Sequence, residues 1–174
     1  MRKLITVLAI MAMAGGAYAA NIDQGTKELG LSGGVDFDSA VDTRIDFALS
    51  YGYFVRDAVE LIGEVEVSDD DISTRYSFGG GAEYNWDLGS EWVPYAGASV
   101  LFSGTDKDVG GSDNAAVGKV SLGAKYFLRD SVAPYVAVDY KIASEDIYPE
   151  LDGQVVKYSD DEVVISWGIR FYWD

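Results

Sequence analysis

Eight segments of this chain, each about ten residues long, alternate apolar residues with small or charged ones. Such alternation is typical of β-strands with one apolar and one polar face, because successive side chains of a strand point in opposite directions. A strand that crosses a bilayer needs roughly 9–11 tilted residues, which matches the length of these segments. The expected strands cover residues 27–37, 43–53, 59–67, 75–86, 92–102, 119–126, 132–142 and 162–173.

The connections between the expected strands are short at one end and long at the other. Three are short turns, at 54–58, 87–91 and 128–131, while two long polar connections lie at 103–116 and 144–161. This asymmetry is typical of outer-membrane barrels, whose periplasmic turns are short and whose extracellular loops are long. We therefore expect four outward loops, at 38–42, 68–74, 103–116 and 144–161.

The composition of the two strand faces favours a membrane barrel over a soluble one. The polar rows are rich in Gly, Ala and Ser with scattered charges, as suits the narrow interior of an eight-stranded barrel. Aromatic residues gather where alternate strands end, as in the aromatic girdle at a membrane interface. The sequence thus predicts an all-β fold, an eight-stranded antiparallel up-and-down transmembrane β-barrel, with a soluble β domain as the alternative. The expected girdle consists of Tyr51, Tyr53, Phe54, Tyr84, Trp86, Trp92, Tyr126, Phe127, Phe171, Tyr172 and Trp173.

The start of the chain is typical of a secretory signal peptide. A positively charged beginning is followed by an apolar core of about ten residues and by the small-x-small site Ala17-Tyr18-Ala19. The apolar core is too short to cross a bilayer as a helix, which needs about 20 residues. We therefore expect a signal peptide at 1–19 and an outer-membrane β-barrel at 20–174, exported through the periplasm to an outer membrane of the Gram-negative type.

The chain is strongly acidic. Its 13 basic and 29 acidic residues give a net charge of −16, and removal of the signal peptide takes away two basic residues, which leaves 11 against 29, or −18. So acidic a protein does not attract nucleic acid, and no nucleic-acid partner is expected. The absence of cysteine excludes a disulfide framework and thiol chemistry.

Together these features resemble the small outer-membrane β-barrel superfamily, the OmpA/OmpX-like, opacity-type and porin-like barrels. The resemblance covers essentially all of residues 20–174, and its most specific part is the closing strand, 163–173. The alternation and aromatic end of that strand look like the C-terminal signal that the barrel-assembly machinery reads, although here Trp173 is followed by Asp174. The resemblance implies a monomeric barrel, with outer-membrane lipids and the assembly machinery as partners.

The residue types available for chemistry argue against an enzyme. The chain has no histidine, which removes the commonest general base, the Ser-His pair and histidine-based metal sites. Glu64 and Glu66 share one inward row with Glu60, so an acid–base pair is one interpretation, and an ion-pair network is the favoured one because buried charges need partners. We expect no catalytic residues, no cofactor-binding residues, no metal site and no cofactor.

The favoured interpretation is a network of interior charges that plugs the barrel. We expect the long side chains of Arg44, Arg75, Lys141 and Arg170 to cross the lumen and reach Glu60, Glu64, Glu66 and Glu83. The expected inward acids are Glu28, Asp36, Asp46, Glu60, Glu64, Glu66, Glu83, Asp139 and Glu162, and the expected inward cations are Arg44, Arg75, Lys119, Lys125, Lys141 and Arg170.

The acidic loops carry the remaining functional expectation. Asp106 and Asp108 begin a pattern that faintly resembles a calcium loop, but the twelfth position is Val117 rather than an acid, so a solvated anionic surface is favoured. We expect a non-enzymatic barrel with a structural or surface-interaction role, in which these loops bind an extracellular ligand. The alternative is a narrow, porin-like pore for small solutes.

Overall fold

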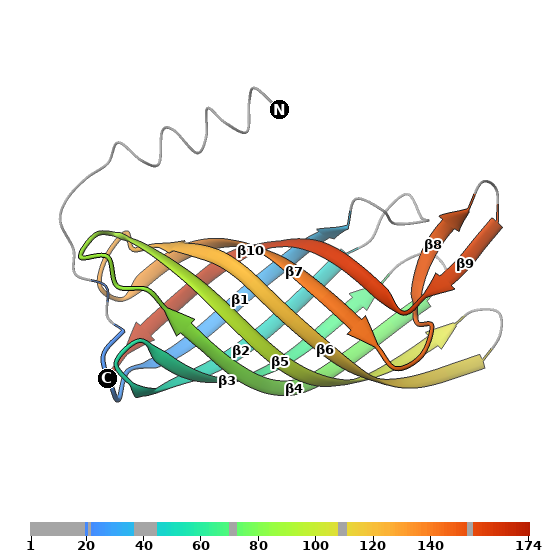
Figure 1. Cartoon of the computed structure of the whole chain (residues 1–174), viewed down its shortest axis with the longest axis horizontal. Helices are drawn as coiled ribbons and strands as arrows, with labels where there is room; N and C mark the ends of the chain where they lie inside the picture. Colours follow the sequence, from blue (N-terminus) through green and yellow to red (C-terminus); the bar gives the residue numbers. More distant parts are fainter. Residues whose placement is uncertain (1–19, 21, 37–44, 70–72, 108–110, 153–154) are drawn as a thin grey trace, which may run out of the picture.

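The computed structural model describes residues 20, 22–36, 45–69, 73–107, 111–152 and 155–174. Eight antiparallel strands of this part of the chain close into a barrel, and two more form a separate hairpin (Figure 1). No helix among the described residues is long and apolar enough to cross a membrane. The barrel strands are β1 (Lys27–Asp36), β2 (Ile45–Arg56), β3 (Val59–Asp69), β4 (Ser73–Asn85), β5 (Trp92–Lys107), β6 (Gly111–Tyr126), β7 (Val132–Ala143) and β10 (Asp161–Trp173), and the hairpin is β8 (Tyr148–Asp152) with β9 (Val155–Ser159).

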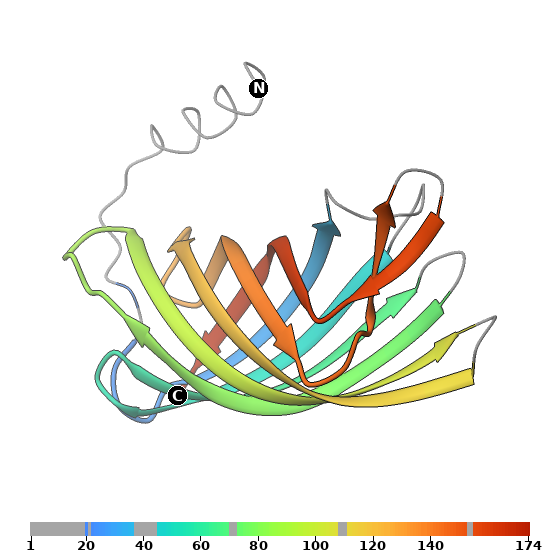
Figure 2. The same ribbon diagram turned by 45° about the vertical axis from the view of Figure 1, so that its right-hand side comes forward.

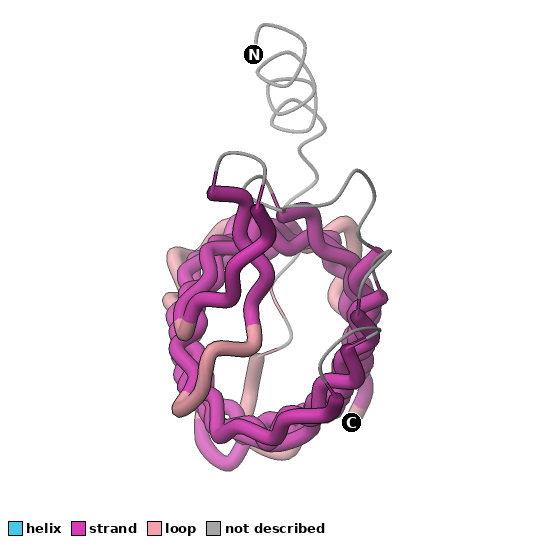
Figure 3. Tube along the Cα trace, turned by 90° about the vertical axis from the view of Figure 1, so that its right-hand side faces the viewer, coloured by secondary structure: helices cyan, strands magenta, loops and turns pink. Residues whose placement is uncertain are grey.

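The order of strands around the ring confirms the predicted up-and-down barrel. The ring runs β1-β10-β7-β6-β5-β4-β3-β2, so each barrel strand pairs with its neighbours in sequence once the β8–β9 hairpin is set aside. The first and last strands close it, in a register that pairs Lys27 with Trp173 and Val35 with Ile165. Figure 3 shows this closure from one end of the barrel. All eight predicted transmembrane strands are present.

Three of the four expected loops are wrong in their extent, and the fourth, 38–42, lies outside the described residues. In the expected loop 68–74, residues 68–69 belong to β3 and residues 73–74 belong to β4. Most of 103–116 is strand, because β5 and β6 stay paired as far as Lys107 and Gly111, and β4 pairs with β5 as far as Lys107. Ser103 and Thr105 keep pointing inward there, so the two-residue alternation persists where polar composition alone suggested a loop. The expected loop 144–161 holds the β8–β9 hairpin, whose register pairs Tyr148 with Ser159.

The barrel is apolar outside and polar inside, the reverse of a soluble protein. On the outer face Phe47 is 54% exposed and Phe78 is 62% exposed, whereas Glu28 and Lys125 on the inner face are 0% exposed. Exposed apolar side chains arranged around a whole barrel form a surface suited to lipid. This arrangement favours the transmembrane interpretation over the soluble alternative.

Glycines on the inner face of β4 let neighbouring strands approach closely. A Cβ atom placed on Gly79 would lie 2.1 Å from the carbonyl oxygen of Val100, and one on Gly81 would lie 2.1 Å from that of Ala98. No side chain fits at these two positions without moving the backbone of β5. The triple glycine of β4 therefore serves the tight curvature of a small barrel.

The expected aromatic girdle is confirmed in part. Tyr51, Tyr84 and Trp86 are exposed on the outer face, and the rings of Tyr84 and Trp86 meet edge to face with centroids 5.2 Å apart. The assignment of Phe54, Phe127 and Tyr172 to the girdle is wrong, because these side chains are buried inside the barrel. Each of the three is next in sequence to an aromatic residue of the outer face. Because successive side chains of a strand point in opposite directions, it lies on the inner face.

These inward aromatics seal the end of the barrel that carries the short turns, which is the periplasmic end in barrels of this kind. The segment before β1 folds back to complete the seal: the backbone N–H of Ala58 donates to the carbonyl of Ile22, and that of Phe54 donates to Thr26, both at 2.9 Å. In Figure 2 the C-terminus lies at this end, opposite the β8–β9 hairpin. The sealing cluster comprises Ile22, Phe54, Val93, Phe127, Ala133 and Tyr172.

The lipid-facing assignment can be tested with neighbouring residues of β2. Phe47→Arg should destabilise the barrel by roughly 2–4 kcal/mol if the side chain lies near the bilayer midplane. Ala48→Ser, one residue along and on the inner face, should have little effect. The measurement is refolding into liposomes, followed by the difference in gel mobility between unboiled and boiled samples. Equal tolerance at both positions would contradict the transmembrane barrel.

Candidate functional site

The chemistry-bearing residues of this protein lie inside the barrel, in three layers of ion pairs. The strands are tilted and closed, so every second residue projects into a lumen only wide enough for side chains to fill. Strands β4 and β10 stand four places apart in the ring of eight, and so do β3 and β7, so each pair lies on opposite sides of the lumen. Each layer contains one ion pair that joins such opposite strands.

The inner layer lies next to the periplasmic seal and is buried. Arg170 of β10 reaches across to Glu83 of β4, with 3.1 Å between guanidinium and carboxylate, and also contacts Glu28 of β1 at 2.7 Å. The ammonium of Lys125 on β6 contacts Glu83, lies 3.2 Å from Glu28 and lies 3.6 Å from Glu60 of β3. Two cations therefore hold three carboxylates from three different strands.

Tyrosine rings enclose the cations of the inner layer. The Arg170 guanidinium carbon lies 4.9 Å from the ring centre of Tyr95 and 4.5 Å from that of Tyr135. The Lys125 ammonium lies 5.0 Å from the ring of Tyr95 and 5.9 Å from that of Tyr172. Cation–π contacts of this kind replace part of the hydration that a buried cation loses. Ions and rings together fill the lumen at this level.

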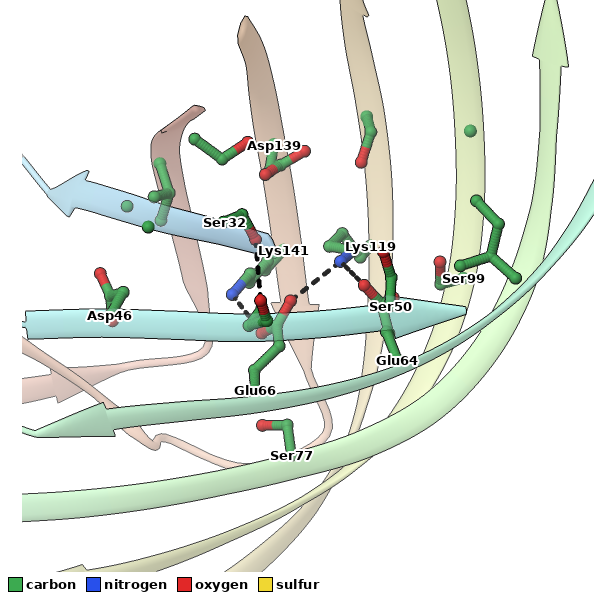
Figure 4. A pocket seen from close by; sticks show the side chains of 18 of the residues that line it. Ser32, Asp46, Ser50, Glu64, Glu66, Ser77, Ser99, Lys119, Asp139 and Lys141 are labelled. Atoms are coloured by element: carbon green, nitrogen blue, oxygen red, sulfur yellow. Dashed lines mark hydrogen bonds and ion pairs between the residues drawn. The ribbon is translucent and has the colours of Figure 1, made fainter. Parts of the chain in front are cut away.

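The middle layer joins β3 to β6 and β7. The ammonium of Lys141 lies 2.8 Å from one oxygen of Glu66, and that of Lys119 lies 2.9 Å from the other and also contacts Glu64 (Figure 4). Both members of the candidate acid–base pair are thus engaged by the same ammonium group. This arrangement favours the ion-pair network over the catalytic interpretation. An acid–base pair needs two carboxylates in different environments, whereas these two share the same ammonium group.

The outer layer spans the mouth of the barrel. The Arg75 guanidinium of β4 lies 3.6 Å from the carboxylate of Glu162 on β10. The same group stacks on the ring of Tyr148 at 4.7 Å and donates a hydrogen bond of 3.4 Å to the carbonyl of Ile147. Arg75 therefore connects the barrel wall both to the opposite strand and to the segment that precedes β8.

The predicted network is confirmed, but its pairing differs from the expectation. Lys141 and Arg170 reach the expected row of glutamates, whereas Arg75 pairs with Glu162 rather than with that row. Lys119 and Lys125, which were expected to point inward without a crossing role, make the most central contacts. Alternation tells which face a residue occupies but not its height along the axis, which depends on strand tilt and register. The expected cation Arg44 lies outside the described residues, as does the side chain of Asp36.

A polar cavity of about 90 Å³ lies between the outer and inner layers. Asp46, Asp139 and the charged groups of the middle layer line it (Figure 4). A polar cavity of this size has room for ordered water, which can satisfy polar groups that other side chains do not. Its walls also carry a set of serine hydroxyls, from Ser32, Ser50, Ser68, Ser77, Ser99, Ser121 and Ser166.

The described residues do not support a metal centre. Within them, no group of three or more Asp, Glu, His or Cys side chains is placed to hold an ion. The faint calcium-loop pattern that begins at Asp106 extends into 108–110, which lie outside the described part of the chain. The interior acids of the three layers face ammonium and guanidinium groups instead.

Comparison with known proteins identifies the fold. No family model and no curated protein matches the sequence. The structure is similar to the N-terminal β-barrel domain of Pseudomonas aeruginosa OprF, with a TM-score of 0.65 and 19% identity over 86% of this chain and 98% of that one. It is also similar to Neisserial surface protein A (TM-score 0.60, 17% identity, 84% and 94% coverage) and to the outer membrane protein OprG of Pseudomonas aeruginosa (0.53, 15%, 90% and 98%).

This chain has the fold of the small outer-membrane β-barrels. The resemblance expected from the closing strand and the alternating segments is confirmed at the level of the fold, and the fold agrees with the expected location in an outer membrane. At sequence identities below 20%, the function of a residue in those proteins cannot be transferred to a residue of this chain. The function of the chain therefore depends on its own interior and its own loops.

The inner layer should contribute strongly to stability. Lys125→Met keeps the length of the side chain but leaves three buried glutamates with Arg170 alone, and removing one partner from a buried ionic cluster costs about 3–5 kcal/mol. Lys27→Met, at the half-buried start of β1, is the matched control and should cost less than about 1 kcal/mol. Urea unfolding in liposomes measures both. Equal stability of the two variants would show that the buried cluster contributes little.

Proposed function

We propose that this protein is a non-enzymatic outer-membrane barrel whose role is structural or surface-interacting, exercised through its acidic outer loops. The observation that carries the proposal is the closed lumen. Arg170 and Lys125 tie together glutamates from opposite walls in a fully buried layer, and the apolar seal around Phe54 and Phe127 lies beyond it. A barrel that is blocked in this way acts at its surface rather than by conduction.

The outer end of the barrel offers a strongly acidic surface. Among the described residues the exposed acids there include Asp106 and Asp113 on the extended β5–β6 ladder and Glu145 and Asp146 before β8. Such a surface creates a negative potential that attracts basic partners and repels acidic ones. We infer that a partner of the outer loops is positively charged.

The absence of enzymatic activity rests on the residues available inside and outside the barrel. The chain has no histidine and no cysteine, and Glu64 and Glu66 both contact the ammonium of Lys119. Carboxylates that balance the charge of a buried ammonium serve the ion-pair network of the lumen. A structural role for this pair needs no further assumption.

A narrow pore is the second candidate, and the polar cavity is the observation that favours it. The cavity of about 90 Å³ lies in the outer half of the lumen and is lined by charged and hydroxyl groups, as a solute path would be. To become a pore it would have to continue through the inner layer and the periplasmic seal. The buried contacts of Arg170 and Lys125 stand in that path.

Conduction decides between the two candidates. Purified, refolded protein in planar bilayers should show no stable, porin-sized conductance, because ion pairs and aromatic rings fill the lumen. Glu64→Gln combined with Glu66→Gln removes the negative charges that balance Lys119 and Lys141, and should loosen the middle layer and lower stability without abolishing any reaction. Steady ohmic channels from the unmutated protein, together with solute uptake into liposomes, would replace the interaction proposal with the pore.

The surface role predicts binding that depends on outer charge. Liposomes carrying the protein should capture basic proteins in preference to acidic ones from a defined set of soluble proteins, and salt should weaken the capture. Neutralising Asp106, Asp113, Glu145 and Asp146 as amides should abolish the preference. The matched control neutralises four acids at the opposite end and has the same net charge. Equal loss in both variants would assign the effect to overall charge rather than to the outer surface. The four control acids are Asp23, Asp87, Glu91 and Asp130.

A further inference from the structure

The connection between β7 and β10 turns back into the outer mouth of the barrel. Ile147 is 0% exposed and Tyr148 is 3% exposed, although both belong to a segment that leaves the barrel wall. Their side chains complete a small apolar cluster whose other members are inward residues of the barrel strands. Those members are Leu101 of β5, Ala115 and Val117 of β6, and Ala143 of β7.

The rest of this connection is tied less tightly to the barrel. Strands β8 and β9 pair with each other in a sheet of their own and with no barrel strand among the described residues. Figures 1 and 2 show the hairpin standing off the end of the barrel. At its base the N–H of Ala143 donates to the carbonyl of Asp160 at 2.6 Å, and that of Ser144 donates to Ala116 at 2.9 Å. A hairpin held at its base can swing as a unit once its inward residues are released.

Arg75 links these inward residues to the cavity. Its side chain lines the cavity on one side, and its guanidinium on the other side contacts the Tyr148 ring and the Ile147 carbonyl. The same guanidinium pairs with Glu162 on the opposite wall. Loss of Arg75 would thus remove the ion pair across the mouth, its contact with the Tyr148 ring and its hydrogen bond to Ile147 together.

We propose that residues 145–149 form a lid over the outer mouth of the lumen, that Arg75 is its latch, and that release of the latch opens the polar cavity to small hydrophilic molecules from outside. The wall of serine hydroxyls, ammonium groups and carboxylates matches polar occupants and excludes apolar ones. The inner layer and the periplasmic seal stay closed beneath the cavity. The lid therefore governs a chamber with one entrance rather than a channel, and it goes beyond the surface role proposed above.

The absence of cysteine makes the lid directly testable. Ser77→Cys places a single thiol on the inner face of β4, two residues below Arg75 and in the wall of the cavity. The probe is a small cationic methanethiosulfonate reagent, and the labelling rate is followed by mass spectrometry on protein refolded in liposomes. A folded gel mobility for each unboiled variant shows that the barrel is intact.

The lid predicts slow labelling of Ser77→Cys in the otherwise unmutated protein. Adding Tyr148→Ala or Arg75→Ala should raise the rate about tenfold for each 1.4 kcal/mol of lid contact that is lost. Tyr140→Ala is the matched control, because Tyr140 is an exposed tyrosine of β7 that lies outside the lumen, and it should leave the rate unchanged. If Arg75→Ala fails to fold, Tyr148→Ala alone decides the outcome. Fast labelling without any lid substitution, or equally slow labelling with and without Tyr148→Ala, would overturn the lid.

A second reporter separates the lid from the proposed closed lumen. Val93→Cys lies in the periplasmic seal, below the inner layer, and an externally added reagent should leave it unlabelled in all lid variants. Labelling of Val93→Cys together with Ser77→Cys would show that the inner layer does not block the lumen. That result would reject the closed-lumen proposal while leaving the lid in place.

Discussion

The narrow lumen is the constraint on which the rest of this structure depends. Closing eight strands into a ring leaves an interior that only side chains can fill, while lipid outside requires the apolar residues to face outward. Polar and charged side chains must therefore share a small space, and an unpaired charge there is costly. The ring geometry provides the solution, because it places β4 opposite β10 and β3 opposite β7. Arg75–Glu162, Lys141–Glu66 and Arg170–Glu83 are the resulting pairs across the lumen.

The two ends of the lumen are apolar, whereas its middle is polar. Ile22 and Phe54 help to build an apolar seal at the periplasmic end, and Ile147 and Tyr148 help to build a smaller one at the outer mouth. Charges and serines lie between them around the cavity, where water can satisfy them. The inner layer needs tight pairing and tyrosine rings because the seal excludes water on one side of it, whereas the side chains of the middle layer are less buried.

The sequence was sufficient to predict the fold, because a two-residue period states which face each side chain occupies. It predicted all eight barrel strands and the inward positions of Glu28, Lys125 and Arg170. It did not predict which charges meet, because pairing depends on height along the axis and on register, which no local pattern records. Phe54 and Phe127 do not belong to the girdle, because clustering of aromatic residues does not tell which face of the strand each one occupies. The sequence did not predict the strand nature of 103–107 and 111–116, because the polar composition of these residues resembles that of a loop although the alternation continues.

Similarity to other barrels constrains the fold of this protein and leaves its role open. Structures that match at 15–19% identity share the fold, and a fold alone does not specify a task. What distinguishes a given barrel is what fills the lumen and what extends beyond the membrane. Here Arg75 contributes to both the lumen and the outer segment, since its side chain lines the cavity and its guanidinium stacks on the ring of Tyr148. Arg75 is thus a side chain through which the closed barrel and its outer segment can influence each other.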